Sequence, residues 1–434
     1  MRATTLGGVL AAALLTLALT AAPAEAAGSR TNRVSYTNTG HQSNGDSNAS
    51  AVSGDGRYVA FVSFASNLVA GDTNGLLDLF LRDRQAGTTK RISVSSQGAQ
   101  QTTGIVGDPD ISSDGRYVVF SSDATELAPG GVVGQTDIYV RDTVANTTRR
   151  VSVGLGGADA DGGSASPRIT PDGKYVVFSS AADNLVAGDT NGFLDIFVVT
   201  LATGAAARAS LGAGGQANGP SFEPVMSANG RYVAFESAAS NLVAGDIGSQ
   251  TDVFVRDLVS AATRRVSEVA GVGGNEISAQ PAISADGRFV AYGSSATNLV
   301  PGDTNDSSDV FLWDRTNGST KRVSVGPQGV QGGEGSGLFN GVGISYSGRY
   351  ISFTSAASNL VADDTNSSND VFVYDATTGI VRRVSVSTAG GEGNHPSFRA
   401  RISVDGRHVS FVSQATTLVA NDTNGFMDIF VRDN

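Results

Sequence analysis

The sequence contains no cysteine, only three histidines and fewer basic than acidic residues, and each shortage narrows what the protein can be. Without cysteine it forms neither a disulfide nor the lipidated cysteine of a bacterial lipoprotein. The 41 acidic residues outnumber the 30 basic ones and give a net charge of -11. This balance argues against nucleic acid or an anionic membrane surface as a partner, because both require a basic footprint. Glycine, in contrast, occurs 55 times, so short strands and many turns are expected.

A long hydrophobic run occurs only at the N-terminus. Arg2 precedes an apolar stretch over 6–21, and small residues follow up to Ala26, which is the pattern of a signal peptide with an Ala-x-Ala cleavage site. No later segment approaches the ~20 apolar residues that a membrane-spanning helix needs. We therefore predict a signal peptide over 1–26, a mature domain over 27–434, and a secreted, extracytoplasmic monomer that does not insert into a membrane.

One motif with the theme Ile-Ser-x-Asp-Gly-Arg-Tyr-Val-x-Phe is repeated seven times along the chain. Each unit has a turn glycine, an aromatic residue five positions later and an aspartate seventeen positions after that. The glycines are Gly56, Gly115, Gly173, Gly230, Gly287, Gly348 and Gly406, and the aspartates are Asp78, Asp137, Asp195, Asp252, Asp309, Asp370 and Asp428. The constant spacing predicts seven copies of one structural unit.

Each unit predicts four strands, named a to d. Strand a ends at the Asp-Gly turn, strand b is Arg-Tyr-Val-Val-Phe, strand c is Asp-Ile-Phe-Val, and strand d is Arg-Val-Ser-Val, as over 150–153 and 383–386. Strands b and c are apolar at successive positions, so both of their faces should be buried, as they are between the blades of a propeller. Strand a carries Pro109, Pro167, Pro224 and Pro281, and proline favours an edge strand, here beside the central channel. The predicted fold is an all-β, seven-bladed β-propeller.

The seventh unit lacks strand d, because the sequence stops after its strand c at Asn434. An isolated Arg-Val-Ser-Tyr segment over 33–36 precedes the first unit at the spacing of a strand d. We expect this N-terminal strand to complete the last blade and so to protect an exposed strand edge. The units occupy essentially the whole mature domain, so no separate catalytic domain is expected.

The repeats resemble the WD-repeat-like propeller repeats of the TolB-like family, found in the C-terminal domain of the Tol-Pal translocation protein TolB and in many exported bacterial proteins. The resemblance is carried by the Ser-x-Asp-Gly-Arg-Tyr-Val-x-Phe and Asp-Ile-Phe-Val-Arg-Asp strings over the whole mature chain. Trp313 and Asp314 also place a Trp-Asp pair at the end of a strand c, where WD repeats carry theirs. The resemblance concerns the propeller part of TolB, not its N-terminal domain, and implies a binding platform.

Five of the seven loops between strands b and c carry an Asp-Thr-Asn-Gly-x-x-Asp motif or a close variant, while units two and four depart from it. The motif has two interpretations. Clustered carboxylate and carbonyl oxygens suit calcium, with Asp72, Asn74 and Asp78 in the first unit and Asp189, Asn191 and Asp195 in the third as the candidate ligands. Alternatively the loop is purely structural: Asx turns shape it, and the closing aspartate satisfies backbone amides beside strand c. We favour the structural interpretation, because the central acidic ligand and terminal glutamate of an EF-hand-type loop are missing.

Charged residues in strand a break the sevenfold symmetry. The residue before the last apolar position of this strand is charged only in units two, three and seven, and further charges stand two residues earlier. Because adjacent strands a lie close together near the axis, these side chains can converge on a polar ligand pocket or pair between blades. The candidate ligand-binding residues are Asp108, Asp110, Arg168, Glu223, Arg399 and Arg401.

No catalytic residues can be assigned from the sequence. His41, His395 and His408 occur in different contexts, which argues against a three-histidine metal centre, and a Gly-x-Ser-x-Gly elbow and a Walker loop are absent. The loops between strands b and c and those between strand d and the next strand a are expected on one face of the propeller, the loop-bearing face. We predict an exported, non-enzymatic binding protein that engages a protein or glycan through this face. The alternatives are a propeller-fold polysaccharide lyase or glycosidase, and a calcium-stabilised cell-surface structural protein; no cofactor other than calcium is predicted.

Overall fold

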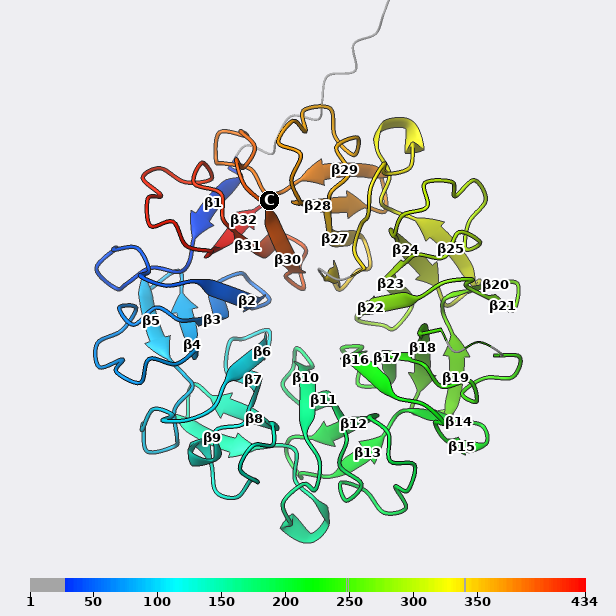
Figure 1. Ribbon diagram of the computed structural model, residues 1–434, viewed down its shortest axis with the longest axis horizontal. Helices are drawn as coiled ribbons and strands as arrows, with labels where there is room; N and C mark the ends of the chain where they lie inside the picture. The colour runs from blue at the N-terminus through cyan, green and yellow to red at the C-terminus, as the bar shows by residue number, and fades with distance from the viewer. Residues whose placement is uncertain (1–27, 247, 249, 339–340) are drawn as a thin grey trace, which may run out of the picture.

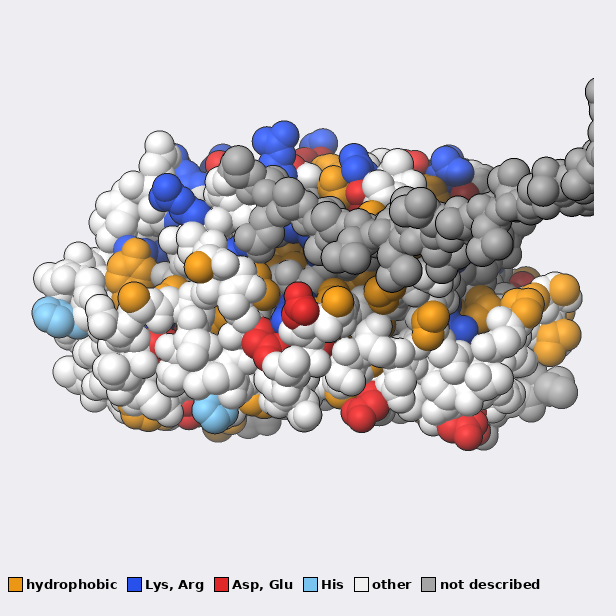
Figure 2. All heavy atoms as spheres, turned by 90° about the horizontal axis from the view of Figure 1, so that it is seen from above, with side chains coloured by type: hydrophobic (Ala, Val, Ile, Leu, Met, Phe, Trp, Pro, Cys, Tyr) orange, Lys and Arg blue, Asp and Glu red, His pale blue; other side chains and the backbone are white. Residues whose placement is uncertain are grey.

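A computed structural model describes residues 28–434 except 247, 249, 339 and 340. The predicted signal peptide over 1–26 lies outside the described residues. Seven four-stranded antiparallel sheets form a ring of blades around a central axis, as predicted (Figure 1). From its edge the molecule is a flat disc, with arginine and lysine side chains gathered towards one face (Figure 2). The described part of the chain has no apolar helix of membrane-spanning length.

In blades 1 to 6 the strands run in chain order from the axis to the rim, and in blade 7 the N-terminal strand takes the outermost place. Blade 1 contains β2 (Ser47–Val52), β3 (Tyr58–Ser63), β4 (Asp78–Asp83) and β5 (Thr88–Arg91); blade 2 contains β6 (Val106–Ile111), β7 (Tyr117–Ser122), β8 (Asp137–Asp142) and β9 (Thr147–Arg150); blade 3 contains β10 (Ser164–Ile169), β11 (Tyr175–Ser180), β12 (Asp195–Thr200) and β13 (Ala206–Arg208); and blade 4 contains β16 (Ser221–Met226), β17 (Tyr232–Ser237), β18 (Asp252–Asp257) and β19 (Ala262–Arg265).

The remaining blades repeat this order. Blade 5 contains β22 (Ser278–Ile283), β23 (Phe289–Ser294), β24 (Asp309–Asp314) and β25 (Ser319–Arg322); blade 6 contains β26 (Val342–Ile344), β27 (Tyr350–Ser355), β28 (Asp370–Asp375) and β29 (Ile380–Arg383); and blade 7 contains β30 (Ser397–Ile402), β31 (His408–Ser413), β32 (Asp428–Asp433) and β1 (Arg30–Arg33). The connections between blades carry two small hairpins, β14 (Leu211–Gly212) with β15 (Gly215–Gln216) and β20 (Glu268–Val269) with β21 (Val272–Gly273), and three short 3-10 turns, η1 (Thr125–Leu127), η2 (Leu155–Gly157) and η3 (Pro327–Gly329).

The N-terminal strand closes the ring. β1 pairs antiparallel with β32, with Arg30 opposite Asp433 and Arg33 opposite Phe430. The first and last parts of the chain therefore share one sheet, as the missing seventh strand d predicts.

The predicted position of strand d was wrong, because the strand ends at the arginine instead of beginning there. β9 ends at Arg150. The next residue, Val151, still donates its N–H to the Ile138 carbonyl at 2.7 Å. Ser152 then turns its hydroxyl inward, where Oγ accepts the N–H of Ile138 at 2.9 Å and donates to Asp137 at 2.6 Å. The serine side chain thus replaces a backbone partner, and the ladder stops.

The hydrophobic core lies between blades. Five of the six residues of β7 are buried, as predicted for a strand covered on both faces. One apolar cluster joins Ala60 and Leu79 of blade 1 to Val118 and Phe120 of blade 2. Every blade also stacks an aromatic residue of its strand b on one of its strand c, with ring centroids 5.6 to 6.1 Å apart.

The turn glycine of each unit is required by the aromatic residue of the preceding blade. Gly230 has a φ of +69°, and a Cβ there would lie 2.5 Å from a ring carbon of Tyr175. The same contact recurs around the ring, and at the closure His408 lies against Gly56. The repeated Gly and Tyr positions thus form the joint between neighbouring blades.

Candidate functional site

Strand a carries a bulge at the same point in most blades, and the bulge turns side chains towards the central channel. The register with strand b shifts between Gly107 and Asp110, and Asp108 at the bulge has a φ of +49°. Glu223 and Arg399 occupy the equivalent bulges, with φ values of +42° and +59°. Because strand a is an inner edge strand, its bulge disturbs no outer ladder.

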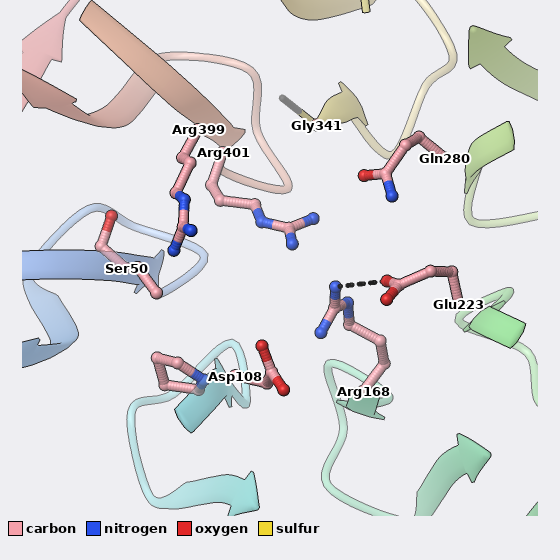
Figure 3. A pocket seen from close by; sticks show the side chains of 10 residues that line it. Ser50, Asp108, Arg168, Glu223, Gln280, Gly341, Arg399 and Arg401 are labelled. Carbon is pink, nitrogen blue, oxygen red and sulfur yellow. Dashed lines mark ion pairs between the residues drawn. The ribbon is translucent and has the colours of Figure 1, made fainter. Parts of the chain in front are cut away.

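These bulges line a cavity of about 200 Å³ in the channel. Five of the six candidate ligand-binding residues lie around it, on four different blades (Figure 3): Asp108, Arg168, Glu223, Arg399 and Arg401. Ala49, Ser50, Pro109, Gln280 and Gly341 complete its described lining. The structure therefore brings the charged residues of strand a together, while their role in binding a ligand stays a prediction.

The acidic side of the cavity is already partnered. Glu223 accepts a hydrogen bond from the Ser166 hydroxyl at 2.7 Å and lies 3.6 Å from the Arg168 guanidinium, as Figure 3 shows. Arg168 also donates to the Pro167 carbonyl at 2.9 Å. Asp108 accepts from Ser121 at 3.4 Å. Glu223 and Arg168 thus form one interblade pair that spans blades 3 and 4.

The basic side of the cavity is not partnered. Among the residues that the structure describes, no carboxylate comes within ion-pair distance of Arg399 or Arg401. Repulsion by Arg168, followed by burial, lowers the pKa of Arg401 to about 10 although Asp110 and Glu223 oppose that shift. Arg399 and Arg401 therefore lack a direct ion-pair partner among the described residues, although Asp108, Asp110 and Glu223 balance the three arginines of the channel in formal charge.

Asp110 is separate from the other five candidates. Its Oδ2 accepts the backbone N–H of Ile169 at 2.9 Å and so links blade 2 to blade 3. Burial raises the pKa of this carboxyl, while the charges of Arg168 and Arg401 lower it. Its described contacts are those of an interblade strut that also places negative charge beneath the arginines.

Glu236 is a buried charged residue near the cavity that the sequence reasoning missed. It lies at the penultimate position of β17, and its Oε1 accepts the N–H of Gln280 at 2.6 Å. Burial, helped by the charge of Glu223, raises the pKa of Glu236 to about 7. The other units have Val62, Ser121, Ser179, Gly293, Thr354 and Val412 at this position. The same comparison between repeats, applied to strand b, would have found Glu236.

In the first b–c loop an arginine lies between two of the three candidate calcium ligands. Arg91 Nη1 is 3.0 Å from Asp72 and 3.4 Å from Asp78. Asn74 turns its amide nitrogen to Asp78 at 3.0 Å and accepts the N–H of Leu76 at 3.1 Å, which is an Asx turn. The guanidinium thus stands in the position a cation would take.

The closing aspartate bonds to side chains and not to the backbone amides that we expected. Asp78 accepts from the Ser93 hydroxyl, and Ser93 Oγ in turn accepts the N–H of Leu79 at 3.0 Å. The Ser93 hydroxyl thus lies between the carboxylate of Asp78 and the backbone of strand c and bonds to both.

The third b–c loop repeats this arrangement. Arg208 Nη1 lies 2.6 Å from Asp189 and 3.2 Å from Asp195, and Asn191 donates to Asp195 at 2.8 Å. Burial raises the pKa of Asp189, while Arg208 lowers it.

Blade 6 has an acidic cluster that could hold a metal ion. One oxygen each of Asp364, Asp370 and Glu392 lie within 4.8 Å of one another. Arg383 Nη1 contacts all three, at 3.4, 3.3 and 2.6 Å. Three carboxylates with one arginine leave net negative charge, but the guanidinium occupies their centre.

The histidines lie apart in the structure. His408 Nδ1 is 2.6 Å from Asp433, which also pairs with Arg84 of blade 1 at 2.7 Å. His41 and His395 are exposed. His408 thus belongs to the seam between blades 7 and 1.

Neither a protein-family model nor a curated protein matches this chain in sequence, whereas solved structures share its fold. An oligogalacturonate lyase from Vibrio parahaemolyticus has a TM-score of 0.53 and 13% identity, covering 93% of this chain and 90% of the lyase. An oligogalacturonate lyase in complex with manganese matches equally well, with a TM-score of 0.53. The β-propeller domain of the Trilobed protease from Pyrococcus furiosus has a TM-score of 0.54 and 11% identity, covering 90% of this chain and 93% of that domain.

TolB structures are also among the similar structures. TolB from Acinetobacter baumannii has a TM-score of 0.38 and 15% identity, covering 82% of this chain and 76% of TolB. At these identities the similarities establish the propeller fold alone. Membership of the TolB-like family stays a prediction.

Proposed function

We propose that this protein is an exported, non-enzymatic binding protein that holds the anionic group of an acidic glycan in its central cavity. The observation that carries the proposal is the pair Arg399 and Arg401, which line the cavity without an ion-pair partner among the described residues. Guanidinium groups bind carboxylate or sulfate through paired hydrogen bonds. A bound anion would supply the direct ion-pair partner that these two arginines lack among the described residues.

A glycan fits this cavity better than a peptide side chain. Besides the arginines, the lining offers the polar groups of Ser50, Asp108, Glu223 and Gln280, which can accept from or donate to sugar hydroxyls. Apolar lining is limited to Ala49, Pro109 and Gly341 among the described residues. The fold is also that of oligogalacturonate lyase, so oligogalacturonates are a suitable first probe.

The test measures the affinity for oligogalacturonate by titration calorimetry, together with the melting temperature, for Arg399→Ala, Arg401→Ala and the double variant. We expect binding to weaken at least tenfold in each single variant, because a lost charged hydrogen bond costs about 1.5–3 kcal/mol. Arg407→Ala, an exposed arginine of an a–b turn, is the matched control and should bind normally. Full affinity in the double variant would refute the proposal, and so would binding of the fully methyl-esterified oligomer with the same affinity.

A polysaccharide lyase is the second candidate, and Glu236 is the observation in its favour. A carboxyl with a pKa of about 7 beside Glu223 has the protonation behaviour of a general base. The same incubations should be followed for the ultraviolet absorbance of unsaturated uronate products. Turnover that disappears in Glu236→Gln would establish the enzyme and replace the binding-only proposal.

A further inference from the structure

The turns between strands a and b of successive blades contact one another around one end of the channel. The Gly54 N–H donates to the Ser113 carbonyl at 3.0 Å, and the Ser113 N–H donates to the Pro171 carbonyl at 2.9 Å. Across the ring, Tyr346 accepts from the Ala285 N–H at 3.1 Å and donates its own N–H to Val404 at 2.9 Å. Turns of successive blades in direct backbone contact leave little open space at this end.

Tyr346 is the largest residue at its position in these turns. The equivalent residue in every other blade is smaller: Gly54, Ser113, Pro171, Ala228, Ala285 and Val404. Its backbone bonds to blades 5 and 7 place Tyr346 among the joined turns. Burial raises the pKa of Tyr346, and the charges of Asp172 and Asp110, from blades 3 and 2, raise it further. Blades 2 and 3 lie across the ring from blade 6 in Figure 1, so the bulk of Tyr346 adds to the closure of this end.

The cavity lies on the loop-bearing side of the joined turns. Its lining residues on strand a precede the turn residues, by five positions for Ala49 before Gly54 and by three for Arg168 before Pro171 and for Arg401 before Val404.

The cavity is also too small for a whole oligomer. Its volume is about 200 Å³. Sites that enclose a complete small ligand usually measure about 300–1,000 Å³. One terminal unit of a chain fits, and the rest must remain outside at the loops.

We propose that the central channel is a blind pocket that receives one end of an acidic glycan chain from the loop-bearing face, with the joined a–b turns closing the opposite end. This inference rests on the proposed function and specifies the part of the ligand that is recognised. It excludes a chain threaded through the ring and a chain bound along its length.

The first experiment compares galacturonate oligomers with long polygalacturonate in calorimetric titrations of the mature protein. If an end is bound, the dissociation constant per chain stays constant beyond the short oligomers. Expressed per uronate residue it rises with length, so a chain ten times longer needs about ten times the uronate concentration. A constant or improving affinity per uronate residue would overturn the inference.

The second experiment attaches a bulky dye to either end of the same trisaccharide. End-on entry predicts that one label abolishes binding while the other leaves it within about twofold of the unlabelled sugar. Binding with both labels, or with neither, overturns the inference but leaves the proposed function standing. If no unlabelled oligomer binds, or if binding survives in the Arg399 and Arg401 double variant, the proposed function itself fails.

Discussion

Closure of the ring by β1 makes the stability of the whole disc depend on a short N-terminal segment. A protein that begins at residue 37 lacks β1 and leaves the edge of β32 unpaired. The control begins at Arg30 and keeps the strand. β1 also carries Arg33, whose guanidinium lies 2.9 Å from Asp422 and 3.5 Å from Asp428, and it leads to Val34, which is buried.

The expected loss can be summed from these contacts. The four paired residues of β1 contribute backbone hydrogen bonds of about 1 kcal/mol each. Burial of Val34 adds about 2 kcal/mol, and removal of Arg33 from two buried carboxylates costs about 3–5 kcal/mol. The sum approaches 10 kcal/mol, which is comparable to the about 5–15 kcal/mol that stabilise a whole domain. We therefore expect the truncated protein to unfold at a far lower denaturant concentration.

The assay is urea denaturation of both proteins, followed by addition of a synthetic peptide that spans residues 28–40. The peptide should restore the melting temperature of the truncated ring in a concentration-dependent manner, because it binds only the folded state. A peptide with Arg33→Ala should require much higher concentrations. An unchanged melting temperature after truncation would refute the reasoning and show that the ring closes in another way.

Three further predictions concern the blades, the buried acid and the loops. Gly230→Ala should cost more stability in urea denaturation than Gly204→Ala: both positions share the positive-φ strain of about 1–2 kcal/mol, but only Gly230 faces a neighbouring ring; equal losses would refute the interblade joint. The raised pKa of Glu236 means that its carboxyl stabilises the fold below its ordinary pKa of 4.5 and that this contribution is lost as the pH rises through about 7. Glu236→Gln should therefore flatten the stability–pH profile in this range and exceed the wild type above pH 7; parallel profiles would contradict the assignment. Calcium or a chelator should change the melting temperature little, whereas a large chelator effect that disappears when Asp72→Ala and Asp189→Ala are combined would establish a calcium site.

The fold could be predicted because the same pattern of glycine, aromatic and aspartate positions occurs in all seven repeats. The apolar runs of strands b and c recur in register, and the missing strand d at Asn434 has its counterpart before Gly56. The position of strand d was misjudged for a local reason. A valine followed by serine looks like a continuing strand, but Ser152 uses its hydroxyl to end the ladder.

The candidate site was predictable only at strand-a positions where a residue differs in charge from its equivalents in the other repeats. Arg168 and Arg401 stood out because equivalent strands carry neutral residues there. Asp110 stood out equally, yet it bonds to a neighbouring strand, a contact that depends on the distance between blades. Glu236 in strand b and Tyr346 in the a–b turn also differ from their equivalents in the other repeats, but they lie outside the strand-a pattern that predicted the site. Repetition thus reveals exceptions, while only the structure separates a strut from a pocket wall.

The bulge of strand a explains how one ring combines a repeated core with a single site. Stability is built by strands b and c, through apolar clusters that join neighbouring blades and through an aromatic pair within each blade. The bulge lies outside this core, on the inner edge of each blade, so its side chain can change without disturbing a ladder. In the six blades with this bulge it is occupied by Ala49, Asp108, Ser166, Glu223, Gln280 and Arg399, and no two are alike. Where the charge is not paired between blades, as at Arg399, its removal should therefore alter ligand affinity without altering the melting temperature, which is the separation that Arg399→Ala tests.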